Sequence, residues 1–185
     1  MKGIVFTEFL EMVEEKFSPA VVDDIIAACD LPSGGSYTAV GTYEHDEIVQ
    51  LVGALSRLTG QPVPDLLRAF GRHLFGRFAA IYPQFFRGVH SAFAFLMNIE
   101  THIHAEVKKL YPDAELPSFE CHLPGADRME MVYRSSRPFA ALAEGLITGC
   151  AEHFAEHISI DSESLSGDGN CAVRFRLTRT GGARP

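Results

Sequence analysis

Residues 93–117 read FAFLMNIETHIHAEVKKLYPDAELP. Apolar residues recur at helical spacing through the first two-thirds of this stretch, which predicts one long amphipathic helix. His104 lies on the apolar side of that helix, whereas His102 lies about 200° away around the axis. A histidine that faces an apolar space from a rigid helix is either a satisfied core residue or a metal ligand. We therefore expect His104 to point inward and His102 to face water. The apolar stripe consists of Phe93, Leu96, Met97, Ile103, Val107, Leu110 and Tyr111.

The composition indicates a single domain over residues 1–185. Hydrophobic residues make up 46% of the chain, with 14 Phe and no Trp, so the interior suits a flat apolar guest as well as ordinary packing. The formal net charge of -8 argues against binding nucleic acid or an anionic membrane through bulk electrostatics. We find no apolar run long enough to span a bilayer and no signal-peptide pattern, and we expect a cytoplasmic protein. The four cysteines have no CxxC spacing and are expected to be reduced thiols.

Local patterns predict an α+β fold, in which helices dominate residues 1–111 and a small antiparallel sheet with one helix forms residues 112–185. The helical N-terminal part is expected to pack on the sheet, and the crevice between the two parts is the natural ligand site. Expected helices span about residues 1–17, 19–29, 46–58, 64–80, 93–111 and 139–157. Expected strands span about residues 118–122, 129–133, 158–164 and 171–178, with turns at Pro124–Gly125 and Gly167–Gly169 and a frayed tail from Thr180 to Pro185.

Tyr133, Ser135 and Arg137 occupy alternate positions of an extended segment, so their side chains point the same way. Together they offer a phenol, a hydroxyl and a guanidinium, which suit two carboxylates held side by side. The same alternation also occurs on an ordinary solvent-facing strand. Combined with His104 and a Phe-rich interior, these side chains meet the needs of haem, which are an axial imidazole, apolar faces and donors for the propionates.

Over essentially its whole length the chain resembles the haem nitric oxide/oxygen-binding (H-NOX) family, the sensor fold also found in soluble guanylate cyclase, and it looks like a stand-alone bacterial member. The resemblance rests on MKGIVF at residues 1–6, HAEVKKLYPDAELP at residues 104–117 and YRSSR at residues 133–137. A histidine followed by Y-x-S-x-R at this separation is a specific signal. The resemblance implies haem b (iron protoporphyrin IX), seated in the crevice between the two parts of the fold.

The family's site residues carry over position by position. By the resemblance, His104 is the proximal iron ligand, and Tyr133, Ser135 and Arg137 hold the propionates. Pro117 matches the family proline that presses on the porphyrin and distorts it.

The lining on the other side of the haem decides which gas binds. The O₂-binding members place a tyrosine in the helix after the propionate motif, and alignment on that motif puts Leu142 at this position. Leu74 falls where an asparagine supports that tyrosine, and Ile4, Phe78 and Leu146 are expected in the same space. Bound O₂ is stabilised by a hydrogen-bond donor, whereas NO has less need of one. The resemblance therefore implies that ferrous haem binds NO and CO here and forms no stable O₂ complex.

A signalling mechanism also follows from the resemblance. NO weakens the bond between iron and the proximal histidine, and release of His104 would let the helical part shift against the sheet part. Such a shift is a two-state element biased by a ligand. No kinase, cyclase or phosphodiesterase sequence is attached, and stand-alone members act on a separate histidine kinase or cyclic-di-GMP enzyme. We expect a protein partner of that kind and no enzyme activity in the chain itself.

Zinc is not expected. Some family members hold zinc with cysteines and a histidine near the C-terminus, and Cys171 falls at the last ligand position. However, residues 138–142 contain no cysteine, and residues 161–170 contain neither cysteine nor histidine.

Two other classes of function stay open. One is an enzyme, either a haem peroxidase or a metal hydrolase that uses His102 and His104. A peroxidase needs a distal acid–base group, which the expected lining lacks, and the helical phase separates the two histidines. The other is a haem-free module that binds lipid or protein through a Phe-rich cavity.

Overall fold

The computed structural model describes residues 1–165 and 171–181, and it has the predicted α+β architecture. The helices are α1 (Gly3–Lys16), α2 (Pro19–Ala27), α3 (His45–Thr59), α4 (Val63–Ile81), α5 (Ala92–Met97), α6 (His104–Leu110) and α7 (Ala140–His153). Two short segments are the 3₁₀ turn η1 (Pro83–Phe86) and the π-helical turn η2 (Ile99–Ile103). The strands are β1 (Ser118–Gly125), β2 (Arg128–Ser135), β3 (Ile158–Ser164) and β4 (Cys171–Arg179).

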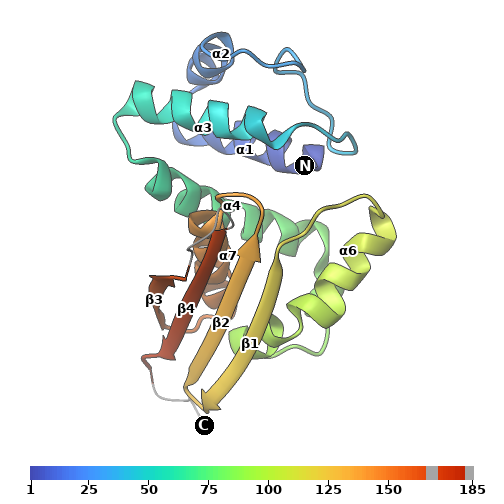
Figure 1. Ribbon diagram of the computed structural model, residues 1–185, viewed down its shortest axis with the longest axis vertical. Coiled ribbons are helices and arrows are strands. Elements are labelled where there is room, and N and C mark those ends of the chain that lie inside the picture. The colour runs from blue at the N-terminus through green and yellow to red at the C-terminus, as the bar shows by residue number, and fades with distance from the viewer. Residues whose placement is uncertain (166–170, 182–185) are drawn as a thin grey trace.

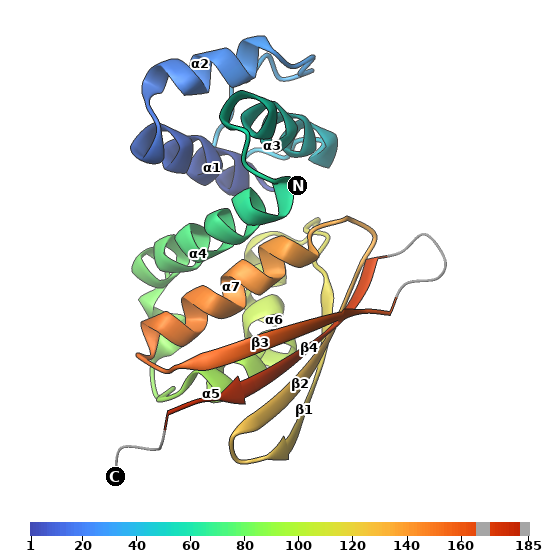
Figure 2. The same cartoon turned by 90° about the vertical axis from the view of Figure 1, so that its left-hand side faces the viewer.

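The helices α1, α2 and α3 form one end of the molecule, and the sheet with α5, α6 and α7 forms the other, with α4 leading from one to the other (Figure 1). The strand order is β1-β2-β4-β3, and every neighbouring pair is antiparallel. One face of the sheet is covered by helices, as Figure 2 shows. The other face carries ion pairs such as Arg176–Glu163 and Arg134–Glu120. Alternation along each strand therefore separates a buried face from a charged one.

Local chemistry explains several element boundaries. Ser18 Oγ accepts a hydrogen bond from the Val21 amide at 3.3 Å, and Pro19 follows it at the start of α2. Gly60 ends α3 with a left-handed φ of 72°. The helix α7 ends at His153, earlier than predicted, because the chain turns through Ala155, whose φ is 54°.

Two predicted turns have different outcomes. The first hairpin turns at residues 126–127, just beyond the predicted Pro124–Gly125, because β1 runs on to Gly125 after an irregularity in its pairing. The turn predicted at Gly167–Gly169 lies outside the described residues, as do the last residues of the predicted tail, 182–185.

The single helix predicted over residues 93–111 is wrong, because this stretch is divided into α5, η2 and α6. In η2 the amides of Ile103 and His104 donate to carbonyl oxygens five residues back. The wider turn changes the phase between α5 and α6. Two residues that we assigned to the apolar stripe, Met97 and Leu110, are 38% and 57% exposed.

The helices α4 and α7 cross in backbone contact. A Cβ added at Gly145 would lie 2.2 Å from the Arg68 carbonyl oxygen, and one added at Gly71 would lie 2.3 Å from the Leu142 carbonyl oxygen. Only glycine allows so close an approach at these two positions. The crossing therefore fixes the spacing of two helices that both line the cavity described below.

Buried side chains form two clusters. The first lies among α1, α2, α3 and α4 and includes Phe6 and Phe70. The second lies between the sheet and α4, α5 and α7, and includes Phe75, Met131 and Phe175. The helix α4 contributes to both clusters, and the subdivision of the chain at residue 111 stays a prediction. In the described part of the chain, no helix has both the length and the apolar character needed to cross a membrane.

We expect Gly145→Ala to lower the free energy of unfolding, because the new methyl group would meet the backbone of Arg68. Overpacking of this kind costs about 1–3 kcal/mol. For a protein of this size, each kcal/mol lowers the melting temperature by roughly 2–4 °C. The matched control is Gly76→Ala on α4, where an added Cβ meets nothing within 4 Å and a helical alanine should be neutral or stabilising. Equal melting temperatures of the two variants, followed by circular dichroism, would mean that the crossing tolerates a side chain.

Candidate cofactor-binding site

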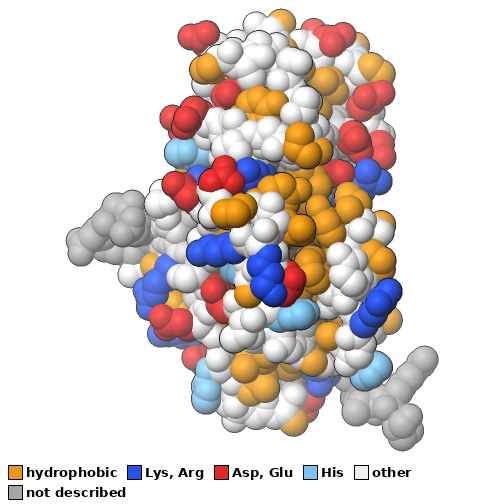
Figure 3. Space-filling model, turned by 90° about the vertical axis from the view of Figure 1, so that its right-hand side faces the viewer, with side chains coloured by type: hydrophobic (Ala, Val, Ile, Leu, Met, Phe, Trp, Pro, Cys, Tyr) orange, Lys and Arg blue, Asp and Glu red, His pale blue; other side chains and the backbone are white. Residues whose placement is uncertain are grey.

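An apolar cavity of about 720 Å³ lies between the helical part and the sheet. Its volume falls within the range of about 300–1,000 Å³ that is typical of small-molecule and cofactor sites. On the face of the molecule where α6 lies, hydrophobic side chains gather near the middle (Figure 3). The structure brings every predicted site residue to this one cavity, which is lined by Ile4, Leu74, Phe78, His104, Pro117, Tyr133, Ser135, Arg137, Leu142 and Leu146 among others.

His104 opens α6 directly after the π-helical turn, and its side chain is 15% exposed. Its Nδ1 lies 3.1 Å from Oε1 of Glu100, which leaves Nε2 as the nitrogen available to a metal ion. Burial lowers the pKa of His104, while the neighbouring Glu100 carboxylate opposes that shift. A neutral imidazole is the form that binds a metal ion.

Glu100 is a site residue that the sequence analysis missed. Its Oε1 also accepts a hydrogen bond from the Phe119 amide at 2.7 Å, so one carboxylate joins η2 to β1 and orients the His104 ring. Metal-binding histidines usually give their second ring nitrogen to a carboxylate or carbonyl in this way. The signal in the sequence was the spacing of four residues between Glu100 and His104, which places two helical side chains side by side.

The three predicted donors lie at the end of β2 and just beyond it. Tyr133 is buried, and burial raises the pKa of its phenol. The Arg137 amide donates to Ser135 Oγ at 3.0 Å, and the Arg137 guanidinium forms an ion pair with the carboxylate of Glu115. All three side chains line the cavity instead of a solvent-facing strand surface. The chemistry of this donor set fits a ligand with carboxylates, since the guanidinium already holds one.

A second wall of the cavity is apolar. Ile4 comes from α1, and the other residues come from the α4–α7 pair, whose close crossing holds them together. None of these side chains has a hydrogen-bond donor. The residues are Ile4, Leu74, Phe78, Leu142 and Leu146.

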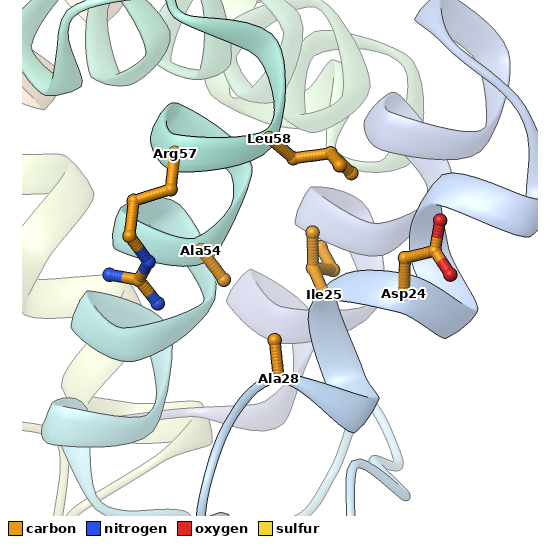
Figure 4. A pocket seen from close by; sticks show the side chains of 6 residues that line it. All are labelled: Asp24, Ile25, Ala28, Ala54, Arg57 and Leu58. Carbon is orange, nitrogen blue, oxygen red and sulfur yellow. The ribbon is translucent and has the colours of Figure 1, made fainter.

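A smaller hollow of about 280 Å³ lies between α2 and α3 (Figure 4). Its two charged side chains, Asp24 and Arg57, come from different helices and lie on opposite sides of it. None of the predicted site residues lies there. Its lining consists of Asp24, Ile25, Ala28, Ala54, Arg57 and Leu58.

His102 is exposed, as predicted, and does not line the cavity, although its ring meets the edge of Phe85, which does. Within residues 1–165 and 171–181, no group of three or more His, Cys, Asp or Glu side chains is placed to hold a metal ion. The free thiols in the structure are those of Cys29, Cys121, Cys150 and Cys171.

The chain matches the family model described as Haem-NO-binding over residues 2–162. The Fe(II) unliganded H-NOX protein from K. algicida is 39% identical to it, with a TM-score of 0.93 and coverage of 100% of this chain and 99% of that one. The H-NOX from Shewanella woodyi, bound to IWP-051 in the Fe(II)CO state, is 41% identical, with a TM-score of 0.83 and coverage of 100% and 97%. The H-NOX protein from S. oneidensis in the Fe(II)NO state is 26% identical, with a TM-score of 0.84 and coverage of 97% and 100%. No curated protein matches the chain.

We expect Glu100→Ala to speed hydrogen exchange at the Phe119 amide, because that amide loses its acceptor. A charge-assisted hydrogen bond of about 1.5 kcal/mol corresponds to roughly tenfold faster exchange by local opening. Glu100→Gln keeps an oxygen at the same place and should have a smaller effect. The control is Glu106→Ala, since Glu106 pairs with Lys109 on α6 and away from β1. If NMR recorded the same exchange rate in Glu100→Ala as in the wild type, the carboxylate would not join η2 to β1.

Proposed function

The chain belongs to the Haem-NO-binding family, the H-NOX proteins, and on that basis we propose that it is a haem-based sensor of NO and CO. One observation carries the proposal. One apolar cavity has a largely buried imidazole in its lining, and it has a phenol, a hydroxyl and a guanidinium at the end of β2 and just beyond it. The pairing of Arg137 with a carboxylate supports the choice of a ligand that carries propionates.

Haem b is the cofactor that we propose for this cavity. Nε2 of His104 would hold the iron, and Tyr133, Ser135 and Arg137 would hold the propionates. When bound, haem supplies an iron atom with one open coordination position for a diatomic gas. Glu100 keeps the His104 ring oriented through Nδ1. Pro117 lines the same cavity, and we propose that it presses on the macrocycle. We propose no zinc site.

Gas selectivity follows from the apolar wall. Because Leu74, Phe78 and Leu142 offer no hydrogen bond, the wall favours NO and CO and gives no stabilisation to the partial negative charge of bound O₂. Ile4 and Leu146 extend the same surface. The CO-ligated and NO-ligated states of two similar H-NOX proteins support this assignment.

In the proposed sensor, the signal begins with the release of His104 from the metal. Because His104 opens α6, its release from the metal would free η2 and α6 to move. Glu100 would carry that movement to β1 through the Phe119 amide. Lys2 Nζ lies 2.9 Å from Asp113 Oδ1 and would carry it to the N-terminal helices. The shift of the helical part against the sheet is the two-state element of the proposal.

The output of such a sensor is a contact with another protein. By analogy with stand-alone members of the family, we propose a separate histidine kinase or cyclic-di-GMP enzyme as the partner, and a sensing role instead of catalysis in this chain. We propose a cytoplasmic location, and the acidic composition argues against nucleic-acid or anionic-membrane binding.

Absorption spectra of the purified protein test the haem proposal. We expect wild-type protein expressed with ample haem to show a Soret band, and His104→Gly to lose it or to regain it only with added imidazole. The control is His102→Gly, which removes an exposed histidine two residues away and should keep the band. Colourless wild-type protein would favour the haem-free cavity module, and an unchanged His104→Gly spectrum would exclude His104 as the ligand.

Spectra under different gases test the selectivity. We expect the ferrous protein to shift its Soret band with NO and with CO, and to give no stable oxy spectrum in aerated buffer, because the apolar wall has no donor. Leu142→Tyr should introduce O₂ affinity by placing a phenol there, whereas Leu142→Phe adds a ring without a donor and should not. A stable oxy complex of the wild type would overturn the assignment.

A further inference from the structure

We propose that Glu115 competes internally with the cofactor, so that its carboxylate occupies the Arg137 guanidinium until a propionate replaces it. This inference rests on the proposed haem site. The Glu115 carboxylate pairs with Nη2 of Arg137, and Nη1 of Arg137 donates to the Glu115 carbonyl oxygen at 3.5 Å. Both residues line the cavity. The donor assigned to a propionate is therefore already engaged by a carboxylate of the same chain.

The exposure of the two partners decides which of them moves. The Arg137 side chain is 13% exposed, whereas the Glu115 side chain is 76% exposed. A largely buried guanidinium needs an anion, because an unpaired charge away from water is costly. The Glu115 carboxylate can return to water at little cost. Arg137 therefore stays in place, and one carboxylate replaces the other.

The charges nearby favour this exchange. The Met1 ammonium lies close to the same pair: burial lowers its pKa, Arg137 adds to the lowering, and Glu44 and Glu115 oppose it. Glu115 thus helps to balance two cationic groups, together with Glu44. Two propionates would supply that balance themselves, and Glu115 would then be repelled by them.

The position of Glu115 links this exchange to the rest of the site. Glu115 lies in the segment that joins α6, which begins with His104, to β1, two residues before Pro117. Release of Glu115 from Arg137 would free the middle of this segment. Binding of the cofactor would therefore also change the conformation of the segment between α6 and β1, which connects His104 to Pro117.

Two measurements with opposite expected signs test the proposal. In Glu115→Gln, the equilibrium affinity for haem, measured by competition with apomyoglobin, should rise roughly three- to fivefold, since the competing carboxylate is gone. The melting temperature of the haem-free protein should fall by about 2 °C, since Arg137 loses its partner. A merely structural role for Glu115 would lower the haem affinity and the melting temperature together.

The matched control is Glu120→Gln, which removes an equally exposed carboxylate that pairs with Arg134 on the charged face of the sheet, and it should change neither quantity measurably. When Arg137 is already replaced by Gln, the additional change Glu115→Gln should leave the haem affinity the same. A gain that persisted in the Arg137→Gln protein, or an unchanged or weaker affinity in Glu115→Gln alone, would overturn the inference. Wild-type protein that takes up no haem would instead overturn the proposed function.

Discussion

Backbone contact between α4 and α7 is the constraint on which the rest of the structure depends. Gly71 and Gly145 allow the two helices to approach until main-chain atoms meet, so their spacing cannot relax inward. Protein interiors are close-packed, and a large cavity persists only between walls that cannot collapse. Leu74 and Leu142 extend from this pair into the cavity. The helix α4 also belongs to both buried clusters, which holds this wall from two sides.

The side of the cavity that carries His104 is built differently. Neither η2 nor α6, all of whose residues are described, contains a fully buried residue. Ile99 and Ile103 pack against the second cluster but stay only partly buried. Polar contacts add to the hold, namely Glu100 on the Phe119 amide and Lys2 on Asp113. Elements with little buried apolar area open most readily, so the structure pairs a rigid wall with one that a small change in free energy can displace. A sensor that reads the state of His104 needs that asymmetry.

Periodicity in the sequence predicted the fold class, because each amphipathic pattern marks one face that must be buried in a core. The resemblance to the H-NOX family, carried by His104 and the Y-x-S-x-R motif, predicted which residues meet at the cavity. Their roles toward haem stay predictions. The π-helical turn could not be predicted, because a regular helix through Ile99–Ile103 would satisfy the same local preferences. Glu100 was missed although its spacing of four residues to His104 is a local signal, and nothing in the sequence marks its second partner, the Phe119 amide, which lies 19 residues away. Glu115 was missed because Arg137 lies 22 residues away. Contacts of that range depend on the tertiary fold and leave no local pattern.

The π-helical turn has an evolutionary consequence. Such a turn holds one residue more than the α-helical turn it replaces, and each residue of a helix turns the chain by about 100°. If the same residues formed a regular α-helix, the extra residue would turn the His104 imidazole by roughly 100° away from its present direction. Deletion of a single codon within Ile99–Ile103 would remove the extra residue and the wide turn together, so the imidazole would keep facing the cavity. The turn therefore lets this part of the chain gain or lose one residue in evolution without losing the direction of His104.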